Sequence, residues 1–588
     1  MILREFAGIE LKNKEIADIF SNIAAMLGID DSSTSKFEIR AYQRAALTIE
    51  GLQEGLELIY RRGGINALME LPGIGKGLAQ KIEEYLKTGK MKKYEEMRKK
   101  YPIDFVELAK IEGLGAKKIG VLYKKLGVKD VETLKDALEK HKVRELAGFG
   151  AKSEEVLADG IKILESSRGR LLLGDVLPEA ESIVSKLAGS GLAESVIIAG
   201  SIRRMRETVG DIDILALSKS PEKVMDFFSG MDEVKSIISK GPTKTTVWLK
   251  IGTSCDLRVI EPSSFGAAIQ YFTGSKNHNI GVRTIAVKKG YKLNEYGLFE
   301  KSGRLISSSN EETIYAKLGM EWMPPEMRED RGEIKLAQEH RIPDLIQLKD
   351  LLGDMHTHTK ETDGMNTLEE MAAAAGAAGL AYFATTNHTK SLRVARGMDE
   401  KRFEEFFRKV DSLNEKLGGK PAILKGAEVD ILKDGSLDLG RAALEKMDCV
   451  VAAVHSNFSM SYEEMTARVG KALDTGLVNI LAHPTGRVIN QREPYKIDLE
   501  KVAESAVRNM VALEVNSYPS RLDLNDTNIL SLRGYNVMFS VDSDGHNVSH
   551  FGFLRYGIGT ARRGWLTKEK VINTMPLEKT KKFLAKKK

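Results

Sequence analysis

Cysteine is nearly absent from this chain, with two residues in 588. Cys255 and Cys449 both lie in apolar runs that are typical of strands, which argues against a disulfide framework and favours a reducing compartment. Long hydrophobic runs are missing too. The longest nearly uncharged stretch, residues 371–384, is too short and too interrupted by glycine to cross a bilayer. The first fifteen residues carry early charges in place of the apolar core of a secretion signal. We therefore expect a cytoplasmic protein.

A large excess of charge of one sign is also missing. The net charge is +6 and 29% of the residues are charged. This balance is typical of a soluble protein with a mild preference for polyanions, and it is compatible with nucleic acid without requiring it. A chain of 588 residues has room for about three or four domains of ~100–200 residues each.

The first chemical signal lies in residues 199–217, AGSIRRMRETVGDIDILAL. The Gly200-Ser201 turn offers backbone N–H groups and a hydroxyl to a phosphate. Arg203 and Arg204 follow, and their guanidinium groups can neutralise that phosphate. The turn therefore predicts a phosphate site.

Three carboxylates follow the phosphate turn. Asp211 and Asp213 lie two apart in an apolar run, so the alternation of a strand puts both on one face. Asp256 lies in a second strand-like run, residues 254–260, just after another at 245–250. Three carboxylates can hold two divalent cations for a phosphoryl displacement. Without the turn and the third aspartate, Asp-x-Asp would more often be a solvated strand face.

Together, Gly-Ser-x-Arg-Arg, Gly-Asp-x-Asp and the later Asp-x-Arg resemble the palm of the X family of DNA polymerases, the polymerase-beta-like enzymes. The resemblance continues in residues 271–275, YFTGS, and 294–299, NEYGLF. It implies nucleotidyl transfer with Asp211, Asp213 and Asp256 as catalytic ligands of two Mg²⁺ or Mn²⁺ ions. It also implies contacts with the incoming nucleotide and its template: Gly200, Ser201, Arg204 and Gly210 at the phosphates, Tyr271, Phe272 and Gly274 at the sugar, and Asn279 and Arg283 at the base and template.

Residues 1–170 contain three similar glycine turns, each ahead of a helical run. A hydrophobic-Gly-x-Gly turn presents backbone N–H groups at the positive end of a helix, beside a lysine, which suits a DNA phosphate. One such turn alone would more often be an ordinary helix connection. The three copies resemble helix-hairpin-helix elements, which implies DNA binding by Gly73, Gly75, Lys76, Gly113, Gly115, Lys117, Gly148, Gly150 and Lys152.

Lys81 matches, by its spacing from the first turn, the X-family lysine that forms a Schiff base with a deoxyribose phosphate. Tyr42 also matches. Glu38 and Gly77 stand where the beta-type enzymes carry supporting lysines. Read alone, Lys81 is a solvated helix lysine, so the resemblance leaves lyase chemistry open.

Histidine dominates the chemistry of the second half, which holds seven of the ten histidines after residue 350. Six of them follow apolar runs. Strand ends that present His, Asp and Glu toward one point build metal sites in α/β barrels. The pattern resembles the PHP domain, named for polymerase and histidinol phosphatase. This implies up to three Mn²⁺ or Zn²⁺ ions held by His356, His358, Asp363, His388, Glu428, His455, His483, Asp544 and His546.

Two residues depart from the PHP pattern. Asn387 stands where family members commonly carry an aspartate, and we expect the amide to orient the His388 ring less firmly. His550 has no counterpart, so we expect it at the surface or behind the metal ligands.

We therefore expect a multidomain protein with a helical helix-hairpin-helix region, an α+β nucleotidyltransferase palm and thumb, and a distorted (β/α)7-like barrel. The expected domains are an N-terminal lyase-like helical domain (1–90), DNA-binding fingers with two further helix-hairpin-helix elements (91–170), palm (171–262), thumb (263–331), linker (332–348), PHP domain (349–575) and basic tail (576–588).

The resemblance implies a monomeric DNA polymerase that fills short gaps in repair. It also implies dNTPs and gapped or primer-template DNA as partners, and no association with a membrane. It also implies a metal-dependent 3′-5′ exonuclease or 3′-end phosphoesterase in the PHP domain. Three alternatives stay open: a template-independent nucleotidyltransferase, a polymerase whose PHP domain is structural, and a DNA-end-binding scaffold with decayed sites. The intact aspartates argue against the scaffold.

Overall fold

The computed structural model describes residues 2–29, 35–50, 56–109, 111, 114–167 and 170–585. The chain divides into two compact units, one of residues 1–168 with 490–493 and one of all the others. Among the described residues, no helix combines the length and apolar character needed to span a bilayer.

The smaller unit is helical and contains two apolar cores. Phe20, Tyr42 and Leu68 belong to the first core, and Leu122 and Leu134 belong to the second. Its helices are α1 (Ile2–Leu27), α2 (Ser35–Glu50), α3 (Leu56–Met69), α4 (Lys76–Thr88), α5 (Lys92–Lys100), α6 (Phe105–Ala109), α7 (Ala116–Leu126), α8 (Val131–Glu139) and α9 (Ala151–Ser167).

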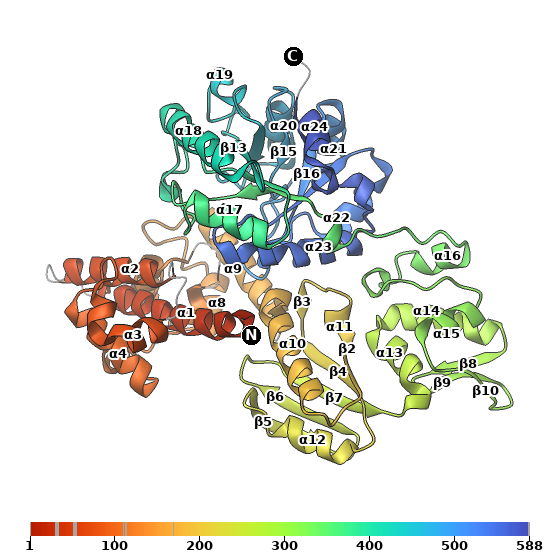
Figure 1. Cartoon of the computed structure of the whole chain (residues 1–588). Coiled ribbons are helices and arrows are strands. Elements are labelled where there is room, and N and C mark those ends of the chain that lie inside the picture. The colour runs from red at the N-terminus through yellow and green to blue at the C-terminus, as the bar shows by residue number, and fades with distance from the viewer. Residues whose placement is uncertain are drawn as a thin grey trace. The chain divides into compact units, whose positions relative to one another are not determined.

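The larger unit begins with a five-stranded sheet in the order β2-β4-β7-β6-β5 (Figure 1). Ile212 and Ile214 of β4 are fully buried, whereas Asp211 and Asp213 on the other face are exposed and half-buried, as the alternation predicts. The elements are β1 (Leu171–Leu172), α10 (Leu173–Gly189), β2 (Ser195–Ile198), α11 (Gly200–Arg203), β3 (Thr208–Val209), β4 (Asp211–Leu217), α12 (Pro221–Ser229), β5 (Val234–Lys240), β6 (Lys244–Leu249) and β7 (Ser254–Ile260).

A small α+β layer follows, with a core that includes Leu298, Ile314 and Tyr315. Its helices pack on the antiparallel sheet β10-β9-β8. The elements are α13 (Phe265–Thr273), α14 (Lys276–Lys288), β8 (Tyr291–Asn294), β9 (Gly297–Glu300), β10 (Leu305–Ser307), α15 (Glu311–Lys317), the 3₁₀ turn η2 (Pro325–Met327) and α16 (Glu333–Gln338).

Seven parallel strands in sequence order then form a nearly closed barrel. The first strand is joined to the segment just after the last strand by a parallel bridge between Thr357 and Gly545. The apolar residues of the strands are buried against the surrounding helices, as expected for a parallel sheet. The strands are β11 (Gly353–Thr357), β12 (Tyr382–Thr385), β13 (Ala422–Asp430), β14 (Cys449–Ala453), β15 (Ile480–Leu481), β16 (Ala512–Asn516) and β17 (Met538–Asp542). The helices are α17 (Leu368–Ala377), α18 (Glu400–Leu417), α19 (Arg441–Leu444), α20 (Tyr462–Leu473), α21 (Leu499–Arg508), α22 (Asp526–Ser531), α23 (Leu554–Arg563) and α24 (Leu577–Leu584).

The segments predicted as a polar linker (332–348) and as a basic tail (576–588) both contribute residues to apolar cores. In residues 332–348, Ala337 packs in the thumb-side core and Ile346 in the barrel core. The Ile346 N–H also donates to the Leu566 carbonyl at 3.0 Å. At the C-terminal end, Thr580 and Leu584 of α24 are buried. Both segments carry enough apolar residues, spaced among the charges, to pack one face.

Candidate nucleotide and metal sites

The three predicted catalytic aspartates come together because β4 and β7 are parallel neighbours. Asp213 lies opposite Asp256 in the register, and Asp211 lies opposite Ser254. Burial raises the pKa of Asp213 to about 6, and the negative charges of Asp211 and Asp256 add to the rise. The cluster concentrates negative charge that a divalent cation would neutralise, so its oxygen donors fit Mg²⁺ or Mn²⁺.

Asp256 is held by two side chains of β6 that the sequence analysis missed. The Thr246 hydroxyl donates to Asp256 Oδ1 at 2.7 Å. Lys244 Nζ lies 2.8 Å from Asp256 Oδ2. Strands β6 and β7 are antiparallel, and Thr246 lies opposite Asp256. A prediction of how the two strands pair would therefore have identified Thr246 as a neighbour of Asp256.

A cleft of about 590 Å³ lies beside the aspartates and is lined by polar and basic side chains. Ten of the predicted palm and nucleotide residues line it: Gly200, Ser201, Arg204, Asp211, Asp213, Tyr271, Phe272, Gly274, Asn279 and Arg283. Arg170, Arg206, Lys276 and Glu329 also line the cleft and were missed. Gly210 is outside this lining, but a Cβ there would lie 3.1 Å from Arg170 Nη1. The cleft therefore places several cations beside an acidic cluster, which suits a nucleoside triphosphate.

Two glycines allow the close approaches in this cleft. Gly200 has φ +60°, and a Cβ there would lie 2.2 Å from Asp213 Oδ2. Gly274 has φ +71°, and its Cβ would lie 3.0 Å from Arg204 Nη1. A side chain at either position would be strained in this backbone conformation and would displace a predicted site residue.

Asn279 is fixed in place before any ligand binds. Its Nδ2 donates to the Tyr271 carbonyl at 2.7 Å, and its Oδ1 accepts from Gln270 Nε2 at 2.8 Å. The Arg283 Nε–H in turn donates to the Asn279 carbonyl at 3.2 Å. The residues predicted at the sugar, base and template thus form one connected group on α13 and α14.

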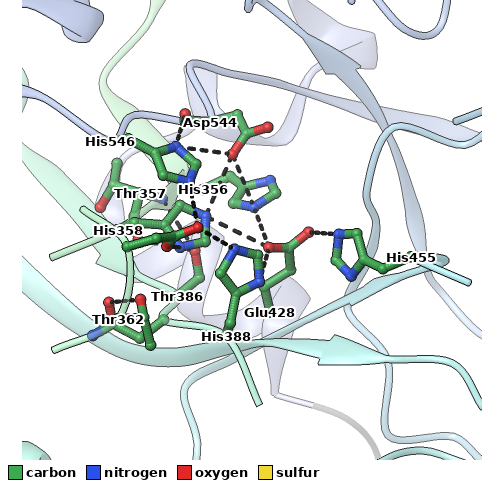
Figure 2. A network of polar contacts seen from close by, with 12 residues as sticks. His356, Thr357, His358, Thr362, Thr386, His388, Glu428, His455, Asp544 and His546 are labelled. Atoms are coloured by element: carbon green, nitrogen blue, oxygen red, sulfur yellow. Dashed lines mark hydrogen bonds and ion pairs between the residues drawn. The ribbon is translucent and has the colours of Figure 1, made fainter. Parts of the chain in front are cut away.

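The barrel brings all nine predicted metal ligands to the carboxyl ends of its strands, and Figure 2 shows seven of them. Each strand except β16 supplies a ligand at or just beyond its end. Three ligand groups have donor atoms within 4.8 Å of one another. They are His358, Asp363, His388 and His546, then His356, His358 and Glu428, and finally His388, Glu428 and His455.

Glu428 is the shared carboxylate of the barrel site. Its Oε2 lies 2.8 Å from His388 Nδ1 and 3.5 Å from His358 Nε2. Its Oε1 lies 3.0 Å from His483 Nε2 and 3.2 Å from His455 Nε2. Glu428 therefore lies close to imidazoles of more than one ligand group.

Asp544 and Asp363 also lie close to the histidines of the barrel site. Asp544 Oδ1 lies 3.4 Å from His358 Nε2 and 3.6 Å from His356 Nε2. Asp363 Oδ2 lies 3.2 Å from His388 Nε2. His358 stacks on His546 and on His388 at 4.1 and 4.4 Å between ring centroids, so several imidazoles present their nitrogens to one small volume.

Unsatisfied polar atoms test whether metal ions fit this site. Within the described residues, the buried atoms His356 Nε2, His358 Nδ1 and Nε2, His388 Nδ1, Glu428 Oε2 and His483 Nδ1 make no hydrogen bond. His388 Nδ1 and Glu428 Oε2 lie 2.8 Å apart as an ion pair but are not aligned for a hydrogen bond. Such atoms are costly to bury unless another group binds them. A mixed set of imidazole and carboxylate donors suits Mn²⁺ or Zn²⁺, so the residues fit metal ions.

The electrostatics of the barrel site also favour cations. Burial opposes protonation of His356, but Asp544, Glu514 and Glu428 outweigh it and hold its pKa well above the usual range. Burial lowers the pKa of His358 to about 3, helped by His546 and His388. The carboxylates thus attract positive charge, while His358 stays neutral and can act as a metal ligand.

Glu514 of β16 supports the ligands and was missed. Its Oε1 lies 2.7 Å from His356 Nδ1, and its Oε2 accepts the His483 backbone N–H at 2.6 Å. A carboxylate behind a ligating histidine fixes the tautomer and orientation of the ring. Glu514 is the one acidic residue in the apolar run 511–515, and this break in the run was the feature of the sequence that could have identified it.

Asn387 and His550, the two departures from the PHP pattern, are both buried. The Asn387 amide is fully buried and binds the 359–362 loop, accepting from the Thr359 N–H at 2.9 Å and the Thr362 hydroxyl at 3.0 Å. It thereby holds the loop that carries Asp363. His550 lies behind a predicted ligand, the second of its two expected places: it is buried, it stacks on Phe553, and its Nδ1 accepts the His546 N–H at 3.2 Å.

In the smaller unit, two of the three predicted DNA-binding turns are described in full. Gly75 and Gly115 are the N-caps of α4 and α7, and Gly73 and Gly148 have positive φ. Lys76 begins α4, Gly150 directly precedes α9, and Lys152 is the second residue of α9. Gly113 and the side chain of Lys117 lie outside the described residues. Lys81 Nζ donates to the Gly77 carbonyl at 3.1 Å and lies 5.9 Å from the centroid of the Tyr42 ring.

Comparisons with known proteins cover nearly the whole chain. Residues 268–329 match the DNA polymerase beta thumb family, residues 11–91 a helix-hairpin-helix domain, and residues 105–162 a SAM-like helix-hairpin-helix tandem. The DNA polymerase/3′-5′ exonuclease PolX of Bacillus subtilis (strain 168) is 35% identical over 577 residues, 98% of this chain and 99% of that protein. DNA polymerase lambda of Arabidopsis thaliana is 25% identical over 54% of this chain and 62% of that protein. A protein named "Probable phosphatase" from Thermoanaerobacter sp. (strain X514) is 29% identical over 40% of this chain and 96% of that protein.

Proposed function

Because this chain belongs to the X family of DNA polymerases that carry a C-terminal PHP domain, we propose that it is a template-directed polymerase that fills short gaps during DNA repair. We propose further that its barrel is a metal-dependent 3′-5′ exonuclease or 3′-end phosphoesterase. The observation that carries the polymerase proposal is the cleft that joins the aspartates of β4 to Arg204 and the α13–α14 residues.

The palm and thumb residues have separate roles in nucleotide addition. Gly200, Ser201, Gly210 and Arg204 hold the triphosphate, while Asn279 and Arg283 position the base against the template. Asp211, Asp213 and Asp256 hold two Mg²⁺ or Mn²⁺ ions. When bound, these ions supply charge stabilisation for the attacking 3′ hydroxyl and for the leaving pyrophosphate. Tyr271, Phe272 and Gly274 line the place of the sugar and exclude a 2′ hydroxyl.

The barrel residues likewise have separate roles in hydrolysis. The nine ligands hold up to three Mn²⁺ or Zn²⁺ ions, and Glu514 fixes the ring of His356. When bound, these ions make water a nucleophile at neutral pH and polarise the phosphodiester. Arg521, 3.8 Å from Asp544, adds a positive charge near the ligands for the DNA backbone.

The smaller unit supplies sequence-independent DNA binding through its glycine turns. Its two apolar cores support a domain boundary near residue 90, and its end at residue 168 supports one near residue 170. The protein acts on gapped or primer-template DNA as a cytoplasmic monomer. Lys81 is the candidate nucleophile for deoxyribose phosphate. Borohydride trapping on incised abasic DNA, compared between the wild type and Lys81→Ala, tests that activity.

One gel assay tests both proposed active sites. A 5′-labelled primer on one-nucleotide-gapped DNA is incubated with Mn²⁺, with and without dNTPs. We expect template-matched extension with dNTPs and stepwise shortening without them. Asp213→Ala should abolish extension and keep shortening, whereas His356→Ala should do the reverse. Shortening by a His356→Ala/His358→Ala double variant would refute the barrel assignment, and untemplated addition would favour a template-independent transferase.

A further inference from the structure

The barrel domain contacts the predicted triphosphate-binding arginine through one residue of α23. Arg563 is 3% exposed. Its Nη1 donates to the backbone carbonyl of Arg204 at 2.7 Å and lies 3.0 Å from Glu329 Oε1. Its Nη2 donates to Asp526 Oδ2 at 2.6 Å. Arg563 therefore contacts Arg204 directly and also through Glu329.

Glu329 is the carboxylate that competes for Arg204. It lines the nucleotide cleft, and its Oε1 lies 3.0 Å from Arg204 Nε. The same oxygen accepts from Arg563, so one carboxylate is shared between two guanidinium groups. Burial opposes ionisation of Glu329, but Arg563 and Arg204 outweigh it and lower its pKa. Glu329 is therefore an anion in the cleft where the phosphates of a nucleotide must bind.

We propose that Arg563 is a positioning residue for nucleotide addition, because it shares the charge of Glu329 and so leaves Arg204 free to bind the phosphates of the nucleotide. The inference rests on the proposed polymerase function. Without Arg563, Glu329 would pair with Arg204 only. An incoming triphosphate would then have to displace Glu329 from Arg204. An arginine has five N–H donors, so the contacts of Arg204 with Glu329 and the Thr273 carbonyl leave donors for a phosphate.

The packing of α23 supports this role. A Cβ at Gly559 would lie 2.6 Å from Met205 Cε, so the helix approaches the residue after Arg204 closely. Asp526 Oδ2, which holds Arg563, also accepts from Arg331 Nη2 at 3.0 Å. Glu329 and Asp526 thus each hold one terminal nitrogen of the Arg563 guanidinium, which sets its position relative to Arg204.

The test is single-nucleotide insertion on one-nucleotide-gapped DNA with the full-length protein, measuring KM for the template-matched dNTP and kcat separately. Arg563→Met should raise KM about tenfold and change kcat less than about twofold. Adding Glu329→Gln to Arg563→Met should restore KM to within about threefold of the wild type, because the competing charge is gone. Glu329→Gln alone, which keeps Arg563, should lower KM about twofold.

Arg555→Met is the matched control. Arg555 lies on the same helix and pairs with Glu181 of the palm at 3.0 Å, but it does not line the cleft. An unchanged KM in Arg563→Met, an equal rise in Arg555→Met, or no recovery in the double variant would overturn the inference. If Arg563→Met does not fold, a raised KM in Glu329→Gln alone overturns it. Absence of templated insertion by the wild type would instead refute the proposed function itself.

Discussion

Gly200→Ala should slow nucleotide addition about 100-fold through a single added methyl group. The new Cβ would lie 2.2 Å from Asp213 Oδ2, which is 1.2 Å closer than the lower end of ordinary van der Waals contact, 3.4 Å. Either the carboxylate or the α11 turn must then move by about that distance. A 1 Å misplacement of a catalytic group costs on the order of 10²-fold in rate, so we expect kcat to fall about 100-fold.

The same substitution also strains the backbone, and a control separates the two effects. Gly200 has φ +60°, and alanine in this region costs about 1–2 kcal/mol. Gly191 has φ +70°, and a Cβ added there would have no heavy atom within 4 Å, so Gly191→Ala carries the strain without the collision. Crowding at Gly200 adds about 1–3 kcal/mol, which a domain with a stability of about 5–15 kcal/mol can tolerate.

The assay is single-nucleotide insertion on gapped DNA for both variants, with thermal melting and 3′ shortening in parallel. Gly191→Ala should insert nucleotides within about twofold of the wild type, and both variants should keep 3′ shortening. Full insertion by Gly200→Ala would refute the close approach of this turn to Asp213. Equal loss in both variants would assign the effect to backbone strain.

Three further predictions concern side chains behind the sites. Thr246→Val removes the hydroxyl that binds Asp256 and should lower insertion about tenfold, with unchanged affinity for gapped DNA in a binding titration. Glu514→Gln should lower metal affinity of the barrel, measured by titration calorimetry, and 3′ shortening by about 10–100-fold, while insertion stays normal. Burial opposes ionisation of Glu311, but Arg328 and Arg203 lower its pKa to about 2. Its contribution to the free energy of unfolding, roughly 3 kcal/mol, is therefore full above pH ~4.5 and lost as the pH falls through about 2. Denaturant melts at pH 5 and pH 3 should show part of that loss in the wild type and not in Glu311→Gln.

Local sequence patterns predicted the ligands because each sits at a predictable place on its element. Alternation along β4 put Asp211 and Asp213 on one face, and apolar runs that end in His or Asp indicated the strand ends of the barrel. The X-family and PHP resemblance is confirmed by the relatives. The individual roles of these residues stay predictions.

The partners of Glu514 and Arg563 could not be predicted because they are distant in the chain. Glu514 lies 158 positions from His356, and Arg563 lies 234 positions from Glu329. No local period encodes such pairs. Asn387 illustrates the same limit: its neighbour in sequence is His388, but its hydrogen bonds go to Thr359 and Thr362.

The segment of residues 332–348 has a consequence for how the protein comes apart. Ala337 belongs to one core and Ile346 to the next, so the connection is anchored at both ends, whereas residues 338–341 between the anchors are exposed. A protease can therefore cut at residues 338–341 without removing Ala337 or Ile346 from its core. After such a cut, the two halves would still be joined by contacts such as that between Arg563 and Glu329.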